Sequence, residues 1–575
     1  MARRTETLRP MTSISRLLTG VVLLISTGIT ETTTTAAAPD ASKRSSSEKA
    51  AVRWVELQQQ DWERHSAKLF TSSEVDALLL KELRTSGHST DAASLTTDEQ
   101  FIRRVTLDLT GHLPGPTDTT QFVAAVEANK RCQLINQLLD SDAFARHWAR
   151  FWRDVVTARI TNRRSMGLTR SFEEWLYEQL RGNRSWGEIT RSILTAEGEL
   201  RFTLNQPSAE NGSLFFLVAH DADEAEERAA ETSRVFLGIQ IQCAQCHHHP
   251  SEKWTREQFH EFAAYFARTK YEQLFTDKKL AGVQLITLTD REHKVASLTN
   301  PDVTSVAHPR FLDGQAPGVN LTDRERRQAL ADAVVSKKNH WFAAAHVNRA
   351  WGELMGHSFY RHVDDLGPKK EVIFPEVLTA LTGSFQTSDY DIKALFRTIM
   401  NTDAYQRRIA RDETSATSLP FAAASRRLRA DALWDALVHV LGKLEPGARF
   451  HTGGGVRFNS SFLEGRFRAE FDFDPSLNPD EVNGTIPQAL FLMNNQVLNK
   501  QIQATKTSVL GGVLRDYPGD PDAVERVYLL ALARKPTDRE LTRCKEYIAA
   551  SPSRAAAFED ILWALINSTE FQCNR

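Results

Sequence analysis

Apolar residues recur at helical spacing along most of the chain from about Trp54 onward. Between Phe144 and Val156 they fall at i, i+4, i+7, i+8, i+11 and i+12, which places them on one broad face of a helix. Thr537 and Glu540 have the spacing of a capping box that starts another helix near the C-terminus. The same apolar spacing flanks that box on both sides, at Val524, Val527, Tyr528, Ala531 and Leu532, and at Phe558, Ile561, Leu562, Leu565 and Ile566. The pattern predicts a mainly α protein.

Two stretches interrupt the helical pattern. Residues 283–288 are typical of a strand, and the nearby Asn-Pro and His-Pro pairs at 300–301 and 308–309 separate short extended pieces. We therefore expect a short β-containing insert at 270–320 that joins two helical domains. Residues 446–484 are expected to be irregular, with a flexible loop at the glycine triplet 453–455, since no Walker lysine follows that triplet.

The first residues have the three parts of a secretory signal. Four arginines precede the apolar run at 17–25, and a small-residue segment at 36–39 follows it. The alternative is an uncleaved single-helix anchor, although the run is short for a membrane span. We expect an exported protein, periplasmic or associated with the cell envelope, without a membrane span apart from this signal or anchor.

The chain of 575 residues is long for a single core. The patterns divide it into a signal peptide (1–38), a linker with an N-terminal helix (39–74), a helical domain (75–269), a β-containing connector (270–320) and a C-terminal helical domain (321–575). The formal net charge of −2 gives no electrostatic reason to expect nucleic acid as a partner. The 11 Trp and 30 Phe exclude disorder over most of the length.

The five cysteines are too few for a disulfide scaffold in a protein of this size. Two of them form the motif Cys243-Ala244-Gln245-Cys246-His247, which is typical of c-type haem attachment. Such a motif is expected by chance roughly 0.001 times in a chain of this composition. In this chemistry two thiols add across the porphyrin vinyl groups and the adjacent imidazole ligates the iron. The motif predicts haem c bound through Cys243 and Cys246, with His247 as the proximal ligand.

The flanking residues predict a helix–turn–helix elbow around this motif. Val235, Phe236 and Ile239 form an apolar face before it, and Thr255 with Gln258 has capping-box spacing after it. The second helix carries aromatic residues on one face, at 259, 262 and 266. They form either the wall of an apolar cofactor pocket or ordinary core.

Other interpretations of the cysteine pair stay open. The two thiols could form a disulfide or redox pair, or hold a structural metal such as zinc with His247 or His249, and His248 is a further candidate ligand. The candidates for a sixth iron ligand are His248, His249, His260, His220 and Met355, and an open position would indicate ligand binding.

The chain resembles the planctomycete cytochrome-associated domain of unknown function followed by the planctomycete-specific C-terminal domain that usually accompanies it. The first resemblance is carried by residues 101–114, 148–152 and 238–254, the last of which contains the Cys-Ala-Gln-Cys-His motif. The second is carried by residues 309–314, 341–342, 347–351, 363–366, 389–393, 401–406, 426–428, 489–494 and 562–568.

The resemblance implies export in a planctomycete-like bacterium and often a neighbouring cytochrome c module in the same chain, but no settled activity. This chain departs from the family in two ways. No separate cytochrome module is expected before residue 75, so 243–247 is the one haem candidate. His248 also stands where the family usually has Asp in an Asp-His-Pro sequence after the motif.

Three further polar features are a carboxylate cluster, a charged run and a single histidine. Asp364 and Asp365, with Arg361 and His362 nearby, could perform acid/base chemistry or belong to a buried polar network. The charged run 224–231 is expected to be a solvated helix face, and His112 a turn residue.

We therefore expect an exported c-type cytochrome-like protein that transfers electrons to a periplasmic redox partner. The alternatives are a haem-free exported binding or scaffold protein with a metal or disulfide at the same site, and a polysaccharide-related hydrolase that uses the carboxylate cluster. Enzymatic and non-enzymatic interpretations both stay open.

Overall fold

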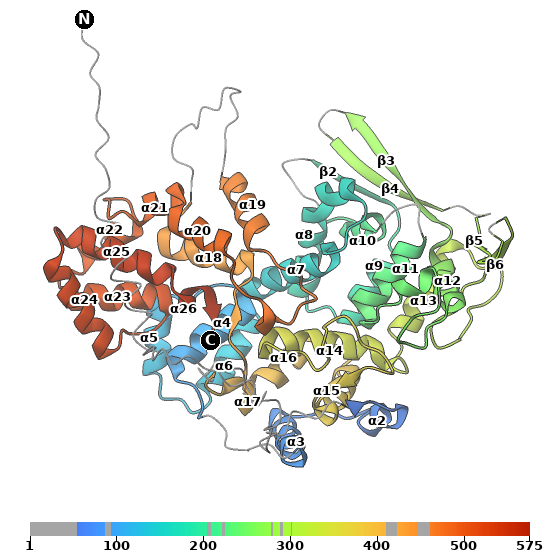
Figure 1. The fold of residues 1–575 in the computed structure, drawn as a ribbon, viewed down its shortest axis with the longest axis horizontal. Coiled ribbons are helices and arrows are strands. Elements are labelled where there is room, and N and C mark those ends of the chain that lie inside the picture. The colour runs from blue at the N-terminus through green and yellow to red at the C-terminus, as the bar shows by residue number, and fades with distance from the viewer. Residues whose placement is uncertain are drawn as a thin grey trace, which may run out of the picture. The chain divides into compact units, whose positions relative to one another are not determined.

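The computed structural model describes residues 55–86, 94–203, 209–220, 225–277, 280–287, 291–300, 302–409, 422–444 and 460–575. The predicted signal peptide and the glycine triplet at 453–455 lie outside these ranges. Helices dominate the described residues, which confirms the mainly α fold (Figure 1). Within these ranges, no helix combines the length and apolarity needed to cross a membrane.

The elements up to the site are β1 (Val55–Glu56), α2 (Gln59–Arg64), α3 (Ser72–Thr85), α4 (Asp98–Thr110), α5 (Pro116–Ala124), α6 (Lys130–Leu139), α7 (Asp142–Thr157), η1 (Arg163–Leu168), α8 (Thr169–Arg181), α9 (Trp186–Leu194), β2 (Glu199–Thr203), η2 (Gly212–Leu214), α10 (Phe215–Ala219), α11 (Ala225–Thr232), η3 (Ser233–Leu237), η4 (Gln242–Gln245), α12 (Arg256–Ala263) and η5 (Ala264–Phe266). Four strands follow: β3 (Thr269–Asp277), β4 (Leu280–Thr287), β5 (His293–Ala296) and β6 (Thr304–Ala307).

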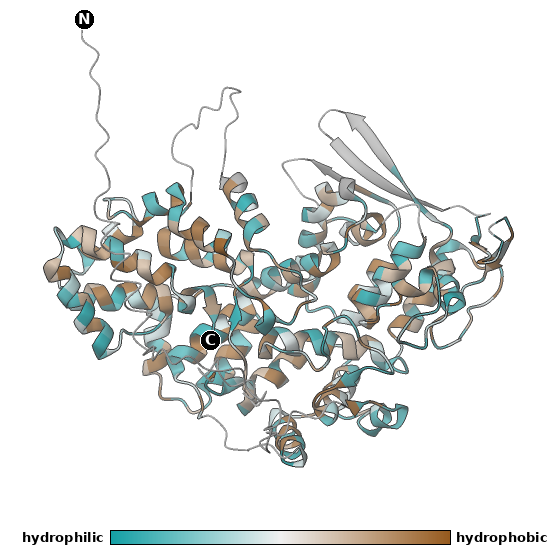
Figure 2. Ribbon diagram, in the orientation of Figure 1, coloured by the Kyte–Doolittle hydropathy of each residue, from teal (hydrophilic) through white to brown (hydrophobic). Residues whose placement is uncertain are grey.

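The remaining elements are α13 (Asp323–Val334), α14 (His340–Met355), β7 (Glu371–Val372), α15 (Pro375–Thr387), α16 (Ile392–Met400), α17 (Asp403–Gln406), β8 (Arg426–Arg427), α18 (Ala430–Leu441), α19 (Ser460–Phe471), η6 (Pro479–Glu481), α20 (Ile486–Asn494), α21 (Gln496–Ile502), α22 (Val509–Asp516), α23 (Asp520–Leu532), α24 (Asp538–Ala550), α25 (Arg554–Ile566), α26 (Thr569–Gln572) and β9 (Cys573–Asn574). Along the helices the ribbon alternates between hydrophobic and hydrophilic residues, as the spacing predicts (Figure 2).

Local sequence explains where several helices begin and end. The Ser141 hydroxyl accepts the Phe144 N–H at the start of α7, and the predicted apolar face of that helix is buried. The predicted capping box of Thr537 and Glu540 starts α24. Helix α4 ends at Gly111, whose φ of 70° is a left-handed conformation that suits glycine.

The strands form small antiparallel sheets. The largest has the order β2-β4-β3, with Leu200 opposite Val283 and Tyr271 opposite Leu285. Strands β5 and β6 pair with each other, and His293 lies opposite Ala307. The predicted strand at 283–288 corresponds to β4, although its sheet also takes β2 from an earlier part of the chain.

The prediction of irregular structure at 446–484 is wrong for α19. Leu463, Phe467 and Phe471 recur every four residues in this helix and are buried. Phe467 packs against Trp434 of α18, with ring centroids 5.2 Å apart. Packing on a distant aromatic side chain therefore stabilises a helix that composition alone did not indicate.

Buried side chains form two hydrophobic cores. The first draws on residues 57–423, and it includes Trp152 stacked on Trp186 with centroids 4.1 Å apart and His346 of α14 at 5.1 Å from Trp152. The second contains mainly residues 428–571, together with Leu107 and Leu113 from the region of α4. Side chains from both sides of the predicted boundary at 320 share the first core, while the domain boundaries themselves stay a prediction.

A buried ion-pair network joins the segment before the cysteines to the C-terminal half. In it, Nη1 of Arg234 donates to Oδ2 of Asp364 at 2.7 Å, and Nη2 of Arg234 donates to Oε2 of Glu231 at 2.6 Å. Arg349 of α14 pairs with the other Asp364 oxygen and donates to the carbonyl of Val235 at 2.9 Å. All four charged side chains are at most 5% exposed. The network fixes η3 against α14.

This network overturns the expectation that the charged run 224–231 is a solvated face. Residue 224 lies outside the described residues, but Arg228 and Glu231 in α11 are buried. Arg228 donates to the carbonyls of Leu217 and Thr269, both at 2.9 Å. The charges can be buried because partners from distant segments satisfy them.

We predict that Asp364→Asn lowers the free energy of unfolding by about 3–5 kcal/mol, because it leaves two buried guanidinium groups without their shared carboxylate. Guanidinium chloride unfolding followed by circular dichroism measures this loss. The matched control is Asp365→Asn, since Asp365 pairs with Lys370 at 2.7 Å in a partly exposed position, and a change of about 0–1 kcal/mol is expected. Equal losses in the two variants would contradict this account of the network.

Candidate functional site

The segment that leads to the cysteines is held tightly against α14. The π-helix η3 ends at Gly238, which has a φ of 66°. A Cβ atom at this position would lie 3.1 Å from the Cβ of Ala345 in α14 and 3.0 Å from a methyl carbon of Leu366. The Leu366 N–H also donates to the Gly238 carbonyl at 2.7 Å. The close approach and the left-handed backbone together require glycine here.

The Cys-x-x-Cys-His motif lies on the surface in the one-turn 3₁₀ helix η4 and the residue pair that follows it. Cys243 and Cys246 are exposed free thiols, while Ala244 between them is fully buried. His247 is exposed, and its Nδ1 lies 2.6 Å from the carbonyl oxygen of His248. A carbonyl can only accept, so Nδ1 carries the proton and Nε2 keeps its lone pair.

The next two histidines close the loop after the motif. Nδ1 of His248 accepts the Arg256 N–H at 3.1 Å, and Nδ1 of His249 accepts the Glu252 N–H at 3.0 Å. Burial lowers the pKa of His249, which favours the neutral acceptor. Within the described ranges, neither histidine forms a group of three close ligand atoms with the cysteines.

The helix–turn–helix elbow is confirmed, but its aromatic wall is core. Thr255 and Gln258 form the predicted capping box at the start of α12. Phe259, Phe262 and Phe266 are at most 1% exposed and belong to the first hydrophobic core. Of the two interpretations of these residues, the pocket wall is therefore wrong, because the rings are buried and Phe262 packs against Phe311, with ring centroids 5.9 Å apart.

The other candidate iron ligands lie away from the exposed face of the motif. His220, directly after α10, and Met355, the last residue of α14, are both fully buried. His260 lies beneath the turn, where its Nε2 donates to the carbonyl of Gln245 at 3.1 Å. Since Gln245 sits between the two cysteines, His260 contacts the motif from its buried side.

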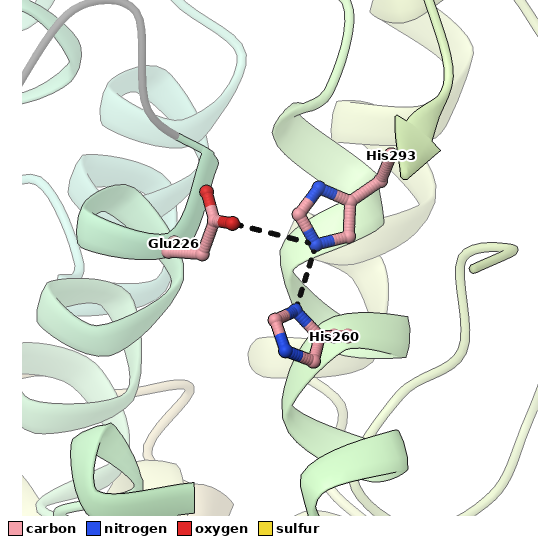
Figure 3. Close-up of side chains that lie close together, drawn as sticks. All are labelled: Glu226, His260 and His293. Atoms are coloured by element: carbon pink, nitrogen blue, oxygen red, sulfur yellow. Dashed lines mark hydrogen bonds and ion pairs between the residues drawn. The ribbon is translucent and has the colours of Figure 1, made fainter. Parts of the chain in front are cut away.

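Beneath the turn, His260 belongs to a cluster with Glu226 and His293 (Figure 3). Nδ1 of His260 lies 2.9 Å from Nε2 of His293, and Nε2 of His293 lies 3.7 Å from Oε1 of Glu226. Glu226 belongs to α11, His260 to α12 and His293 to β5. Among the described residues, this is the one group of three His, Cys, Asp or Glu whose ligand atoms lie within 4.8 Å of one another. Burial lowers the pKa of both histidines, so both imidazoles are neutral near pH 7.

The sequence pointed to only one member of this cluster. His260 was a candidate iron ligand, whereas Glu226 fell in the run expected to be solvated and His293 in the β-containing insert. His260 and His293 are 33 residues apart and come from different elements. No spacing rule connects them, so no local signal could have identified the group.

The carboxylate cluster at 361–365 is divided between two environments. Asp364 is 1% exposed and is bound by Arg234 and Arg349, while Asp365 pairs with Lys370 near the surface. Both Asp364 oxygens are occupied by guanidinium groups, as expected for the buried-network interpretation. His112 lies in the turn after α4, exposed and 3.8 Å from the Asp435 carboxylate.

Comparisons with known proteins find two domain models that match parts of the chain. Residues 74–271 match the model of PSCyt2, a protein of unknown function (DUF1549), and residues 326–460 match PSD1, a protein of unknown function (DUF1553). No curated protein and no solved structure matches the chain. The first match contains the cysteine motif, Glu226 and His260, and the second contains Arg349 and Asp364. The chain is therefore similar, over these two regions and in this order, to the PSCyt2 and PSD1 domains, both of unknown function.

Proposed function

We propose that this protein is an exported redox protein that binds haem c through Cys243 and Cys246, with His247 as the proximal ligand. The observation that carries the proposal is the hydrogen bond from Nδ1 of His247 to the carbonyl of His248. Histidines that ligate metals usually donate their other ring N–H in this way, which fixes the ring and raises the basicity of the ligating nitrogen. Nε2 of His247 is thereby prepared to bind iron.

The placement of the two thiols supports the same proposal. Both are exposed and free, and they lie on one short turn that is anchored by the buried Ala244. The close contacts of Gly238 with Ala345 and Leu366 hold the start of this segment. A porphyrin can approach such a turn from solvent without opening the core.

The residues present fit a haem on the surface rather than in a pocket. Cys243 and Cys246 would hold the porphyrin edge and Nε2 of His247 the iron, which supplies reversible one-electron chemistry when bound. The aromatic residues of α12 remain core and do not cover the group. An exposed cofactor edge suits direct contact with a redox partner in the periplasm. Export is proposed from the arginine-rich start, the apolar run at 17–25 and the small-residue segment after it.

The alternative of a zinc site at the cysteine pair is less well supported by the geometry. His248 and His249 use Nδ1 to accept backbone N–H groups, and within the described residues they do not gather with the thiols. A structural zinc needs four ligands in tetrahedral arrangement.

We expect the mature protein, produced with a haem c maturation system, to give a c-type pyridine haemochrome spectrum with about one haem per chain. The double variant Cys243→Ala/Cys246→Ala should lose the covalent haem, because both attachment points are removed. Cys132→Ala is the matched control, since this cysteine lies in α6 away from the motif, and its haem content should be unchanged. A wild-type protein without a c-type spectrum would end the proposal.

A second prediction separates the proximal ligand from its neighbours. His247→Ala should retain some thioether-linked haem but shift its Soret band and reduction potential, because the iron loses its imidazole. His248→Ala is the control, since this ring is also exposed, and its Nδ1 accepts the Arg256 N–H and lies 3.8 Å from the Glu257 carboxylate. Spectroelectrochemical titration of both variants measures the difference, and equal shifts would contradict the assignment of His247.

A further inference from the structure

The buried cluster beneath the cysteine turn has the composition of a metal site. Glu226, His260 and His293 come from three separate elements, and their side chains face one another in Figure 3. The two histidines are 6% and 7% exposed, and Glu226 is partly exposed. Polar side chains are costly to bury, so a group of this kind calls for an explanation.

The distances between the donor atoms fit coordination of a single ion. Donor atoms bound about 2.1 Å from one ion lie about 3.0 Å apart at a right angle and about 3.6 Å apart at an angle of about 120°. The two nitrogen atoms are 2.9 Å apart, and the nitrogen of His293 is 3.7 Å from the Glu226 oxygen. The ligand atoms of all three residues lie within 4.8 Å of one another, so small side-chain movements would bring them around one ion.

The surroundings orient one ligand toward the centre of the cluster. Nε2 of His260 lies 3.1 Å from the Gln245 carbonyl, which can only accept, so this nitrogen carries the proton. The lone pair of Nδ1 then faces His293 and Glu226. This is the arrangement that outer hydrogen bonds impose on metal-ligating histidines.

A hydrogen bond between His260 and His293 does not account for the position of Glu226. Nε2–H of His293 can donate to Nδ1 of His260, but that single proton leaves the Glu226 carboxylate 3.7 Å away, beyond hydrogen-bond range of the same nitrogen. A cation satisfies both lone pairs and the carboxylate charge together.

We propose that Glu226, His260 and His293 bind one divalent transition-metal ion of the zinc, iron(II) or manganese(II) class. Two imidazoles and one carboxylate select these ions over calcium and magnesium, which prefer all-oxygen ligands. Three protein ligands leave at least one coordination position for water or a small ligand, on the side where Glu226 is partly exposed. The site does not rest on the haem proposal, because none of its three residues belongs to the Cys-x-x-Cys-His motif.

The position of the site gives it a second consequence. The Gln245 carbonyl that holds His260 lies between Cys243 and Cys246. Metal binding would therefore immobilise the turn from below while its thiols remain exposed above. The ion also joins α11, α12 and β5, which tie the PSCyt2 region to the strands that follow it.

The test uses the full mature chain with Cys243→Ser and Cys246→Ser, so that neither haem nor thiolate binding contributes. After treatment with a chelator, the protein is titrated with Zn²⁺ by calorimetry and with Co²⁺ by absorption spectroscopy. We expect one equivalent of Zn²⁺ with micromolar or tighter affinity, a higher unfolding temperature with Zn²⁺, and cobalt d–d bands without sulfur-to-cobalt charge transfer. Absence of this binding would overturn the metal site, and it would leave the haem proposal unaffected.

Two variants identify the ligands. His293→Gln retains a polar side chain but not the imidazole, and Glu226→Gln retains the shape of the carboxylate without its charge. Each should weaken Zn²⁺ binding at least about tenfold while the circular dichroism of the metal-free protein stays unchanged. His308→Ala is the matched control, because His308 is an exposed histidine of the same β-containing region. Binding that is unchanged in both ligand variants, or weakened equally by His308→Ala, would overturn the assignment.

Discussion

The structure depends on one carboxylate shared by two buried arginines. Asp364 binds Arg234 and Arg349, and these arginines also donate to backbone carbonyls of Val155, Arg234 and Val235. Buried ion pairs lose much of their attraction to desolvation. The main contribution of this network is therefore to position helices: it holds α7, η3 and α14 in one arrangement. The cysteine turn follows directly after η3.

A second buried carboxylate plays the same part between the two hydrophobic cores. Asp108 of α4 accepts from Tyr405 at 2.6 Å and from Asn574 at 2.5 Å, and it pairs with Arg426. Burial, together with the negative charge of Asp108, raises the pKa of the Tyr405 hydroxyl, which therefore stays a hydrogen-bond donor. Asp108, Tyr405 and Arg426 come from segments that carry the family resemblance, at 101–114, 401–406 and 426–428. In this chain these three segments are therefore joined by buried contacts.

The cysteine turn stands apart from these networks because its reactive groups face solvent. Cys243, Cys246 and His247 are exposed, while the residues on either side of them are held by the contacts of Gly238 and by the His249 ring. Beneath the turn, His260 and His293 are buried, and this burial lowers the pKa of both imidazoles. The exposed group that we propose for haem and the buried group that we propose for a metal ion therefore both lie next to the Gln245 carbonyl.

Features that depend on neighbours along the chain could be predicted: the apolar face of α7, the capping boxes of α12 and α24, the strand β4 and the cysteine motif. The sequence patterns misplaced Arg228 and Glu231 in a solvated face, missed α19, and left the roles of Asp364 and the α12 aromatics open. Those outcomes depend on partners far away in sequence, 130 residues in the pair of Arg234 with Asp364 and 33 in that of His260 with His293. They could not be predicted from local patterns, because the burial of a charge or a ring is set by the groups that pack against it in the folded protein and not by its own spacing.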